Sequence, residues 1–146
     1  MSDISIKEMN AINKFLHKNK ILSICTSGEN DIWAANCLFT FNEDDMCLFI
    51  STKKETRHAK IMTDNIIVVG TMYSKFPLLF LKQGIQYKGR VILLNGRDVY
   101  KAKEVYLKKY PLFKNKTHDI WKIFLDEIKF TDMKMGRIKN TTWIRI

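Results

Sequence analysis

The chain has 146 residues, of which 46% are hydrophobic and 27% charged, the composition of an ordinary globular protein that buries a sizeable core. No apolar run approaches the roughly 20 residues of a transmembrane helix, and the first residues include acidic side chains and no apolar signal core. Three scattered cysteines, Cys25, Cys37 and Cys47, form no CxxC pair, which favours reduced, buried thiols over a disulfide framework or a metal site. We therefore expect a cytoplasmic protein without a membrane span.

The charge is uneven along the chain. Residues 1–50 contain 4 Lys or Arg against 7 Asp or Glu, whereas residues 51–146 contain 21 against 8, within a net charge of +10. A strongly basic balance favours anionic partners, either a phosphate-bearing cofactor or nucleic acid. The lysines are spread singly, which favours a solvated surface over a nucleic-acid interface.

The first 52 residues predict one helix followed by three strands. Ser5 and Glu8 form a capping box, and apolar residues three or four positions apart follow it, which predicts an amphipathic helix over residues 5–18. Strands are expected at 21–27, 32–41 and 46–52. The turns between them are short and polar, so a β-meander is the simplest topology.

The remaining residues predict helices inserted between further strands. A helix begins near Thr56 and ends at 64–65, and a second begins at a capping Asp98 and ends before Pro111. Strands are expected at 66–73, 83–94, 121–131 and 141–146, with a loop at Pro77 and bulges or close approaches at Gly84 and Gly89. Six or seven strands with local connections predict an α+β fold built on a small antiparallel barrel, as a single domain over 1–146.

The junction after the third strand carries the strongest functional signal. Hydroxyl and basic residues gather where the strand ends and the next helix begins, namely Thr52, Thr56, Arg57 and His58. A helix start presents unpaired backbone N–H groups and the positive end of the dipole. Cations there are mildly unfavourable unless an anion compensates them, so we interpret the junction as a pocket for a phosphate or another anion.

Two amides within strands are further candidates. Asn36 stands between apolar neighbours, and a buried amide there is either a core hydrogen-bonding group or a ligand contact. Gln86 is more typical of an outward-facing polar position. His17 and His118 are expected at the surface, and no histidine pairs with a cysteine or carboxylate at ligand spacing, so no metal site is proposed. No hydrolase or nucleotide-binding motif is present, and no catalytic residue is assigned.

With these residues identified, the chain resembles the pyridoxamine phosphate oxidase-like, FMN-binding split-barrel superfamily, and within it the YhbP-like bacterial branch. The segments that carry the resemblance are Trp33 to Asn36, Thr52 to Ala59, Gln83 to Gly89, Leu125 to Asp132 and Trp143 to Arg145. The resemblance covers nearly the whole length.

The resemblance implies a six-stranded split barrel with flanking helices that forms a homodimer, with FMN in clefts at the dimer interface. Arg57 matches the phosphate-clamping Arg of the superfamily, and Thr56 stands at its Ser. Thr52 matches the Thr beside the flavin ring. The other residues implied to contact the cofactor are Asn36, Gln86, His58, and, across the interface, Trp143 and Arg145.

The chain departs from the family pattern at several positions. His58 replaces a phosphate-binding Lys, and Phe41 stands where the oxidases carry a substrate-gripping Lys. The C-terminal Arg-Leu-x-Pro ending is also absent, so vitamin B6 oxidation is not expected.

The leading hypothesis is an FMN-dependent oxidoreductase acting on a small-molecule redox substrate. The alternatives are haem or a deazaflavin in the same cleft, a cofactor-free dimeric scaffold, and a nucleic-acid-binding module. If haem is bound, the candidate axial ligands are the histidines His17, His58 and His118.

Overall fold

The computed structural model describes residues 4–76, 81–116 and 118–146. Its elements are, in chain order, α1 (Ile6–Lys18), β1 (Ile21–Ser27), β2 (Ile32–Asn42), β3 (Cys47–Ser51), α2 (Arg57–Asp64), β4 (Ile67–Phe76), β5 (Leu81–Leu93), α3 (Arg97–Lys109), the 3₁₀ helix η2 (Pro111–Phe113), β6 (Ile120–Lys134) and β7 (Arg137–Ile144). The loop expected at Pro77 lies outside the described residues. None of the described helices has both the length and the apolar character needed to cross a membrane.

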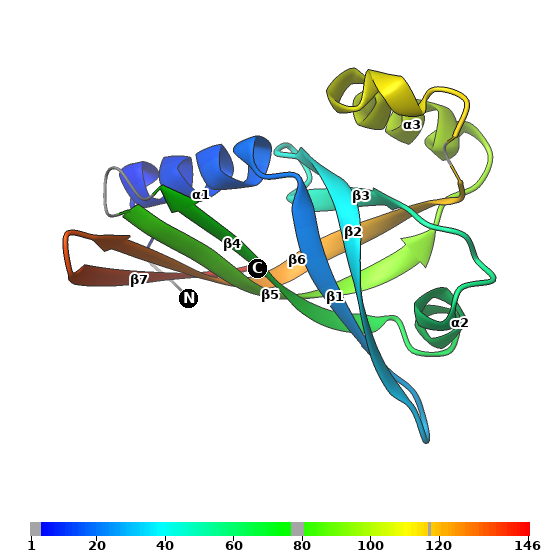
Figure 1. Ribbon diagram of the computed structural model, residues 1–146, viewed down its shortest axis with the longest axis horizontal. Coiled ribbons are helices and arrows are strands. Elements are labelled where there is room, and N and C mark those ends of the chain that lie inside the picture. The colour runs from blue at the N-terminus through cyan, green and yellow to red at the C-terminus, as the bar shows by residue number, and fades with distance from the viewer. Residues whose placement is uncertain (1–3, 77–80, 117) are drawn as a thin grey trace.

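The strands form one antiparallel sheet that closes on itself. Its order is β3-β2-β1-β4-β5-β6-β7, and β3 also pairs with β6. Six strands therefore make a barrel, while β7 extends the sheet beyond it (Figure 1). The expected meander of the first three strands and the α+β split barrel are both confirmed.

β6 belongs to both parts of the sheet because it changes partner along its length. Its first half pairs with β3, from Ser51 opposite Ile120 to Cys47 opposite Phe124, and its second half pairs with β7. The sequence-based bounds of 121–131 and 141–146 were wrong for this hairpin. Met135 and Gly136 both adopt positive φ, 50° and 82°, which makes a tight two-residue turn and lengthens both strands.

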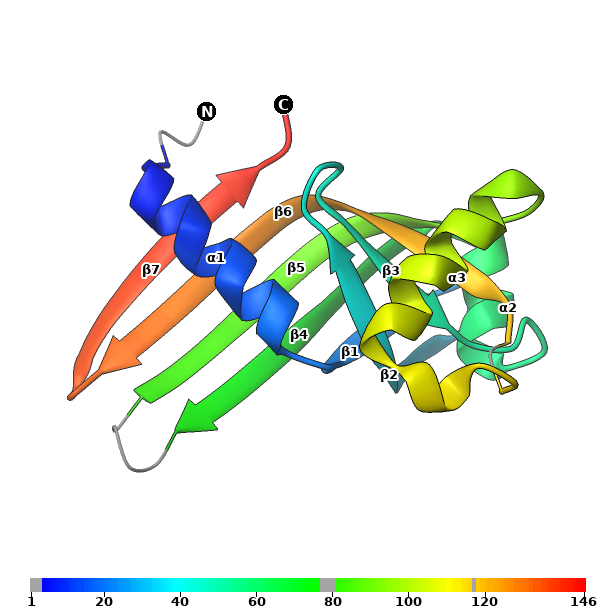
Figure 2. The same ribbon diagram turned by 90° about the horizontal axis from the view of Figure 1, so that it is seen from above.

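α1 covers one face of the sheet. Ser5 caps it, with its hydroxyl accepting a hydrogen bond from the Glu8 amide at 3.1 Å, as the capping box predicted. Its apolar side buries Ile12, Phe15 and Leu16 against the barrel, and the helix lies across the strands from β7 to β4 (Figure 2).

α3 lies on the outside of the barrel, over β3 and the start of β6. Ala102 on α3 packs against a small cluster of Cys47, Phe49 and Ile120. The helix begins one residue before the predicted cap Asp98, because Gly96, with φ 61°, supplies the turn into it. Asp98 instead lies in the first helical turn, where a carboxylate favours the helix dipole.

Two glycines allow strands to approach closely. A Cβ at Gly70 would lie 2.0 Å from the Ser23 carbonyl oxygen and 2.5 Å from the Tyr87 hydroxyl, so no side chain fits there. Tyr87 uses this space to donate a hydrogen bond to the Ser23 carbonyl at 2.8 Å. Gly89 stands at the β-bulge between β5 and β6, where a Cβ would lie 2.4 Å from the Phe124 carbonyl, and this confirms the close approach predicted for it.

Candidate functional site

Thr52 is held rigidly at the end of β3. Its amide donates to the Asp119 carbonyl and its carbonyl accepts from the Trp121 indole N–H, each at 3.0 Å. The residue is 7% exposed, so its hydroxyl is fixed beside the start of α2. The loop after β3 and the segment at the start of β6 therefore hold the Thr52 hydroxyl in one position.

Thr56 caps α2, as the sequence predicted. Its hydroxyl donates to the Lys53 carbonyl at 2.8 Å and accepts from the Ala59 amide at 3.3 Å. The amides of Arg57 and His58 come next, and the first-turn amides of a helix have no acceptor within the helix. The N-terminus of α2 thus offers donors to an anion.

His58 turns back from α2 toward β3. Its Nε2 lies 2.8 Å from the Thr52 hydroxyl and 3.3 Å from the Thr56 hydroxyl. Burial lowers the pKa of the imidazole below its ordinary value of 6.5, so the ring is neutral at neutral pH. At this position His58 orients hydroxyl groups and does not supply the fixed positive charge of a Lys.

Arg57 points away from this network. Its Nε and Nη2 donate to the two carboxylate oxygens of Asp31 at 3.0 and 2.6 Å, and its guanidinium stacks 3.7 Å from the Trp33 ring centroid. The hydrogen bonds from Arg57 hold the pKa of the Asp31 carboxyl below its ordinary value. The predicted phosphate clamp is therefore engaged by the β1–β2 hairpin, whose tip projects beside α2 (Figure 1).

A cavity of about 190 Å³ joins two of the predicted site residues, Asn36 and Thr52. It is lined by Asn36, Cys37, Leu38, Ser51, Thr52, Tyr106, Phe113, Lys116 and His118. Of these, Lys116 was not predicted as a site residue, because it stands in the polar link before β6 with no motif around it, and His118 was considered only as a candidate axial ligand for haem. The Ser51 hydroxyl fixes this link by accepting from the His118 amide at 2.9 Å.

Asn36 and Gln86 lie in one row on the outer face of the barrel. The register places Asn36 opposite Ser23, Ser23 opposite Thr71, and Thr71 opposite Gln86. Asn36 is exposed, which corrects its predicted burial: the apolar neighbours Ala35 and Cys37 face the barrel interior and leave the amide outside. Gln86 is exposed, as predicted.

The same outer row forms the floor of a wider hollow of about 480 Å³. Its lining contains Ser23, Cys25, Val69, Gly70, Thr71, Gln86, Tyr87, Lys88, Glu127 and Lys129. Across its centre, the Ser23 and Thr71 hydroxyls lie 2.8 Å apart, and the Thr71 amide donates to the Ser23 hydroxyl at 2.9 Å. The small cavity reaches Asn36 and the hollow reaches Ser23, so the two are adjacent at this cross-strand pair.

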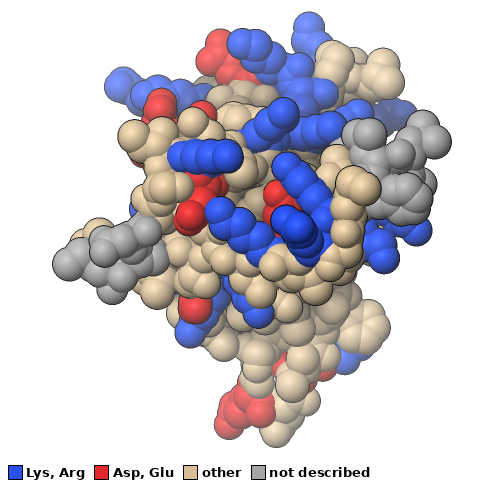
Figure 3. All heavy atoms as spheres, turned by 90° about the vertical axis from the view of Figure 1, so that its left-hand side faces the viewer, with Lys and Arg blue, Asp and Glu red and all other residues tan. Residues whose placement is uncertain are grey.

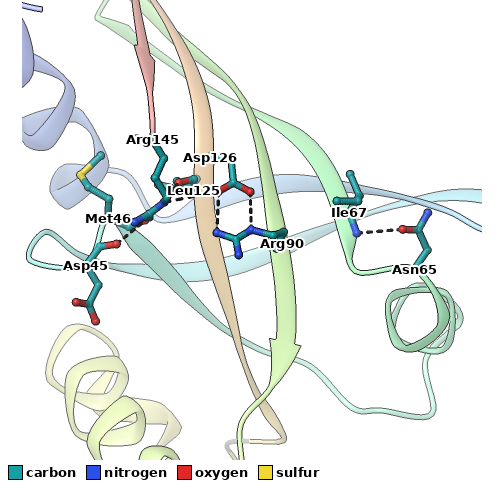
Figure 4. A network of polar contacts seen from close by, with 8 residues as sticks. All are labelled: Asp45, Met46, Asn65, Ile67, Arg90, Leu125, Asp126 and Arg145. Atoms are coloured by element: carbon teal, nitrogen blue, oxygen red, sulfur yellow. Dashed lines mark hydrogen bonds and ion pairs between the residues drawn. The ribbon is translucent and has the colours of Figure 1, made fainter. Parts of the chain in front are cut away.

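Arg145 and Trp143 lie apart from this group. The Arg145 guanidinium donates to three backbone carbonyls of its own chain, those of Leu125, Asp45 and Met46, at 2.7 to 2.8 Å (Figure 4). Trp143 is partly buried against the hydrophobic core. The structure thus gives both residues contacts within their own chain, and Arg145 ties β7 to the turn before β3.

Two acidic residues, Asp126 and Glu127, are adjacent on β6 and point to opposite faces of the sheet, as strand alternation requires. Asp126 accepts two hydrogen bonds from Arg90, both at 2.9 Å, and lies 3.6 Å from Arg145 (Figure 4). Glu127 faces the outer hollow instead. Within the described residues, no three His, Cys, Asp or Glu side chains gather into a group that holds a metal ion.

The fold is shared with proteins of known structure. The chain superposes on a heme binding protein from Mycobacterium smegmatis with a TM-score of 0.72 at 13% identity, over 97% of this chain and 60% of that one. A FAD-binding protein from Mesorhizobium loti gives 0.68 at 12% identity, over 90% and 96%. A proposed pyridoxamine 5'-phosphate oxidase from Listeria innocua gives 0.65 at 14% identity, over 88% and 98%. The fold is therefore that of the pyridoxamine phosphate oxidase-like split barrels.

The sequence relatives define the family more narrowly. No family model matches the chain. It is 36% identical over 135 residues to UPF0306 proteins of Yersinia pestis and Yersinia pseudotuberculosis, covering 92% of this chain and 92% of each relative. The chain belongs to the UPF0306 family.

Proposed function

We propose that this chain is an FMN-binding oxidoreductase of the YhbP-like branch of the split barrels, and that two copies of it complete the cofactor site. The observation that carries the proposal is that Asn36 and Thr52 line one small cavity, and that the Thr52 hydroxyl lies 2.8 Å from His58 Nε2 at the start of α2. These residues come from two strands and a helix, and they present amide and hydroxyl groups beside a helix N-terminus. That set fits a phosphorylated ligand with a polar ring edge.

The phosphate of FMN is placed at the N-terminus of α2. The amides of Arg57 and His58 point that way by helix geometry, and the Thr56 cap fixes the turn. Arg57 joins them by exchanging its carboxylate partner for the phosphate. Its pair with Asp31 is half-exposed, with 51% and 39% of the side chains accessible, so solvent screens the attraction between the two charges. The exchange therefore costs little.

The flavin ring is placed against Asn36 and Thr52, toward Gln86 on the outer row. The cavity of one chain, about 190 Å³, is smaller than the roughly 300 Å³ at which pockets for such ligands begin. A second wall is needed, and the outer face of the barrel supplies a surface for it. This face exposes Ile21, Val69 and Tyr73 to 59%, 44% and 65% around the polar row.

The bound flavin would accept and deliver electrons or hydride, and the protein residues bind and orient it. Thr52 presents a fixed hydroxyl and Asn36 an exposed amide, and the substrate would enter beside the exposed residues Lys116 and His118 on the cavity wall. Phe41 is 5% exposed within the core, so the position aligned with the oxidases' substrate-binding Lys offers no polar group here. We infer from this difference that the substrate is not a B6 vitamer.

Haem is the second candidate, and His118 on the cavity wall is the observation that favours it. His58 is less suited as an axial ligand because its Nε2 faces the Thr52 and Thr56 hydroxyls. His17 pairs with Glu43 and contacts Phe41, away from the cavity. The absorption spectrum separates the candidates, since haem gives a Soret band and flavin gives two bands in the near ultraviolet and blue.

Titration of the purified protein with FMN, followed by flavin fluorescence, tests the proposal. We expect saturable quenching, and Thr52→Val should weaken binding by about tenfold because it removes a fixed hydrogen-bonding group. Thr63→Val is the matched control: Thr63 lies at the far end of α2, where its hydroxyl donates to the Ala59 carbonyl. Absence of quenching in the parent protein, or equal effects of the two variants, would count against the proposed site.

A further inference from the structure

A second cleft is lined by residues of α1 and of the β6–β7 hairpin. These elements lie at the other end of the molecule from α2 (Figures 1 and 2). Its volume is about 470 Å³, and its lining contains Lys7, Glu8, Ala11, Phe130, Asp132, Lys134, Arg137, Ile138, Lys139 and Thr141. None of these residues belongs to the cavity at Asn36 or to the outer hollow. The cleft is therefore separate from the proposed flavin site.

The floor of the cleft is apolar. Phe130 on β6 packs edge-on against Phe15 of α1, with ring centroids 5.6 Å apart. Thr141 stands opposite Phe130 on β7, and Ala11 contributes a small side chain from the helix above. Because Ala11 is small, the space between the helix and the sheet stays open where a larger side chain would fill it.

The mouth of the cleft is basic. Lys134 stands directly opposite Arg137 across the tight turn of the β6–β7 hairpin, and like charges in that position destabilise a hairpin. Strand alternation places both on the same face as Phe130, and Lys7 approaches from the first turn of α1. Lys and Arg side chains gather at this end of the molecule (Figure 3).

The two acidic residues of the cleft, Glu8 and Asp132, only partly balance its four cations, Lys7, Lys134, Arg137 and Lys139. Glu8 pairs with Lys139 at 3.6 Å, whereas Asp132 accepts a hydrogen bond from the neutral Gln83 amide at 3.4 Å and keeps its charge, so the cleft retains an excess of positive charge. In the part of the chain that the structure describes, Lys7, Lys134 and Arg137 form no ion pair. An anionic group at the mouth would relieve the repulsion between Lys134 and Arg137.

We propose that this cleft binds a small organic anion with an apolar body, its body against Phe130 and Ala11 and its charged group between Lys134 and Arg137. Both acyl and aryl carboxylates have this chemistry. Burial of the apolar body supplies affinity, while the two cations select the charge of the head group and its position.

The fluorescent sulfonate 8-anilinonaphthalene-1-sulfonate has an aromatic body and one negative charge, and serves as the probe. With FMN at saturation, we expect its emission to rise on binding to the full chain. Lys134→Gln combined with Arg137→Gln should weaken binding by about tenfold or more, because charged hydrogen bonds are lost. Ala11→Phe should abolish the signal by filling the floor.

Lys75→Gln combined with Lys82→Gln is the matched control. These two lysines also stand opposite each other on neighbouring strands, but on the outer face of the sheet. The control changes the net charge equally, and at about 0.15 M ionic strength it should alter binding less than about twofold. Equal weakening by the two double variants would show attraction by net charge alone and would overturn the proposal, as would probe binding that occurs without FMN and is lost when FMN is at saturation.

Competition between the probe and other small molecules identifies the chemical class of ligand that the cleft binds. Decanoate should displace the probe, whereas decanol and decyltrimethylammonium, which lack the negative charge, should not. Displacement by 1-naphthoate but not by decanoate would restrict the site to aryl anions, still in agreement with the proposal. Equal displacement by decanol would overturn it, since the cations would then contribute nothing. Thermal unfolding of each variant checks that the fold is intact. If Ala11→Phe does not fold, the double variant Lys134→Gln with Arg137→Gln still tests the proposal.

Discussion

Asp31 holds Arg57 through two hydrogen bonds, from Nε and Nη2 of the guanidinium to separate carboxylate oxygens. The pair joins the tip of the β1–β2 hairpin to the first residue of α2, 26 positions later. The Arg57 guanidinium also stacks on Trp33, so it contacts the hairpin at two residues. An arginine assigned by family resemblance to a phosphate thus already has an anionic partner in its own chain.

Asp31→Asn should strengthen FMN binding by about three- to tenfold, because it removes a carboxylate that competes with the phosphate for Arg57. Isothermal titration calorimetry with FMN measures the change. Glu29→Gln, on the same hairpin and with no ion pair among the described residues, is the control for a change of net charge. Weaker binding in Asp31→Asn would mean that the pair positions the site and does not compete with the ligand.

Arg57→Gln should weaken FMN binding by about 1.5–3 kcal/mol, the contribution of a charged hydrogen bond. Lys60→Gln removes the same charge from an exposed position of the same helix and should change the affinity by less than about 0.5 kcal/mol. Riboflavin, which lacks the phosphate, should bind both variants and the parent protein equally. If Arg57→Gln binds FMN as tightly as the parent, Arg57 is not part of the phosphate site.

The pKa of His58 predicts a pH dependence of stability. Burial lowers this pKa in the folded chain below the ordinary 6.5, so between the two values the unfolded chain binds more protons. The free energy of unfolding therefore falls as the pH drops from about 6.5 toward the folded pKa, and stays lowered below it. His58→Gln should flatten this part of the profile measured by urea denaturation between pH 4.5 and 7.5. An unchanged slope in the variant would assign the titration to other groups.

Arg145→Gln should lower the free energy of unfolding by about 1–3 kcal/mol, because carbonyls of Leu125, Asp45 and Met46 lose charged donors. Urea denaturation measures the loss. Arg97→Gln, at an exposed position at the start of α3, should change stability by less than about 0.5 kcal/mol. Full stability in Arg145→Gln together with loss of flavin binding would instead support the contact across the dimer that the resemblance implies.

Val69→Arg should convert the proposed dimer to monomer and remove most FMN affinity, because it places a charge within the exposed outer face of the barrel. Sedimentation velocity follows the mass, and FMN fluorescence follows binding. Val105→Arg, an exposed valine on α3, is the control. A monomeric parent protein that still binds FMN would contradict the shared cleft.

Much of the fold was predictable because local signals agreed with tertiary structure. The capping hydroxyls of Ser5 and Thr56 marked both helix starts, and alternating burial marked the strands. The errors lie where a long-range contact or the backbone conformation of a single residue determines the ends of an element. The β6–β7 hairpin depends on positive φ at Met135, a residue type that carries no turn signal.

The candidate site was less predictable than the fold. The sequence identified Thr52 and Asn36, since a strand end and an isolated strand amide are visible in it, and the structure brings both to one cavity. It could not show that Lys116 and His118 line this cavity, where the His118 amide donates to the Ser51 hydroxyl. Nor could it reveal that Asp31 would bind Arg57, because that pairing depends on how far the β1–β2 hairpin projects.

A crystal structure determined from crystals grown in the presence of FMN would test the central claim most directly. We expect the phosphate within hydrogen-bonding distance of the Arg57 and His58 amides, the flavin ring beside Thr52 and Asn36, and a second copy of the chain covering the other side of the ring. A cofactor bound elsewhere, or a saturating FMN concentration that leaves this corner filled by water or side chains, would contradict the account.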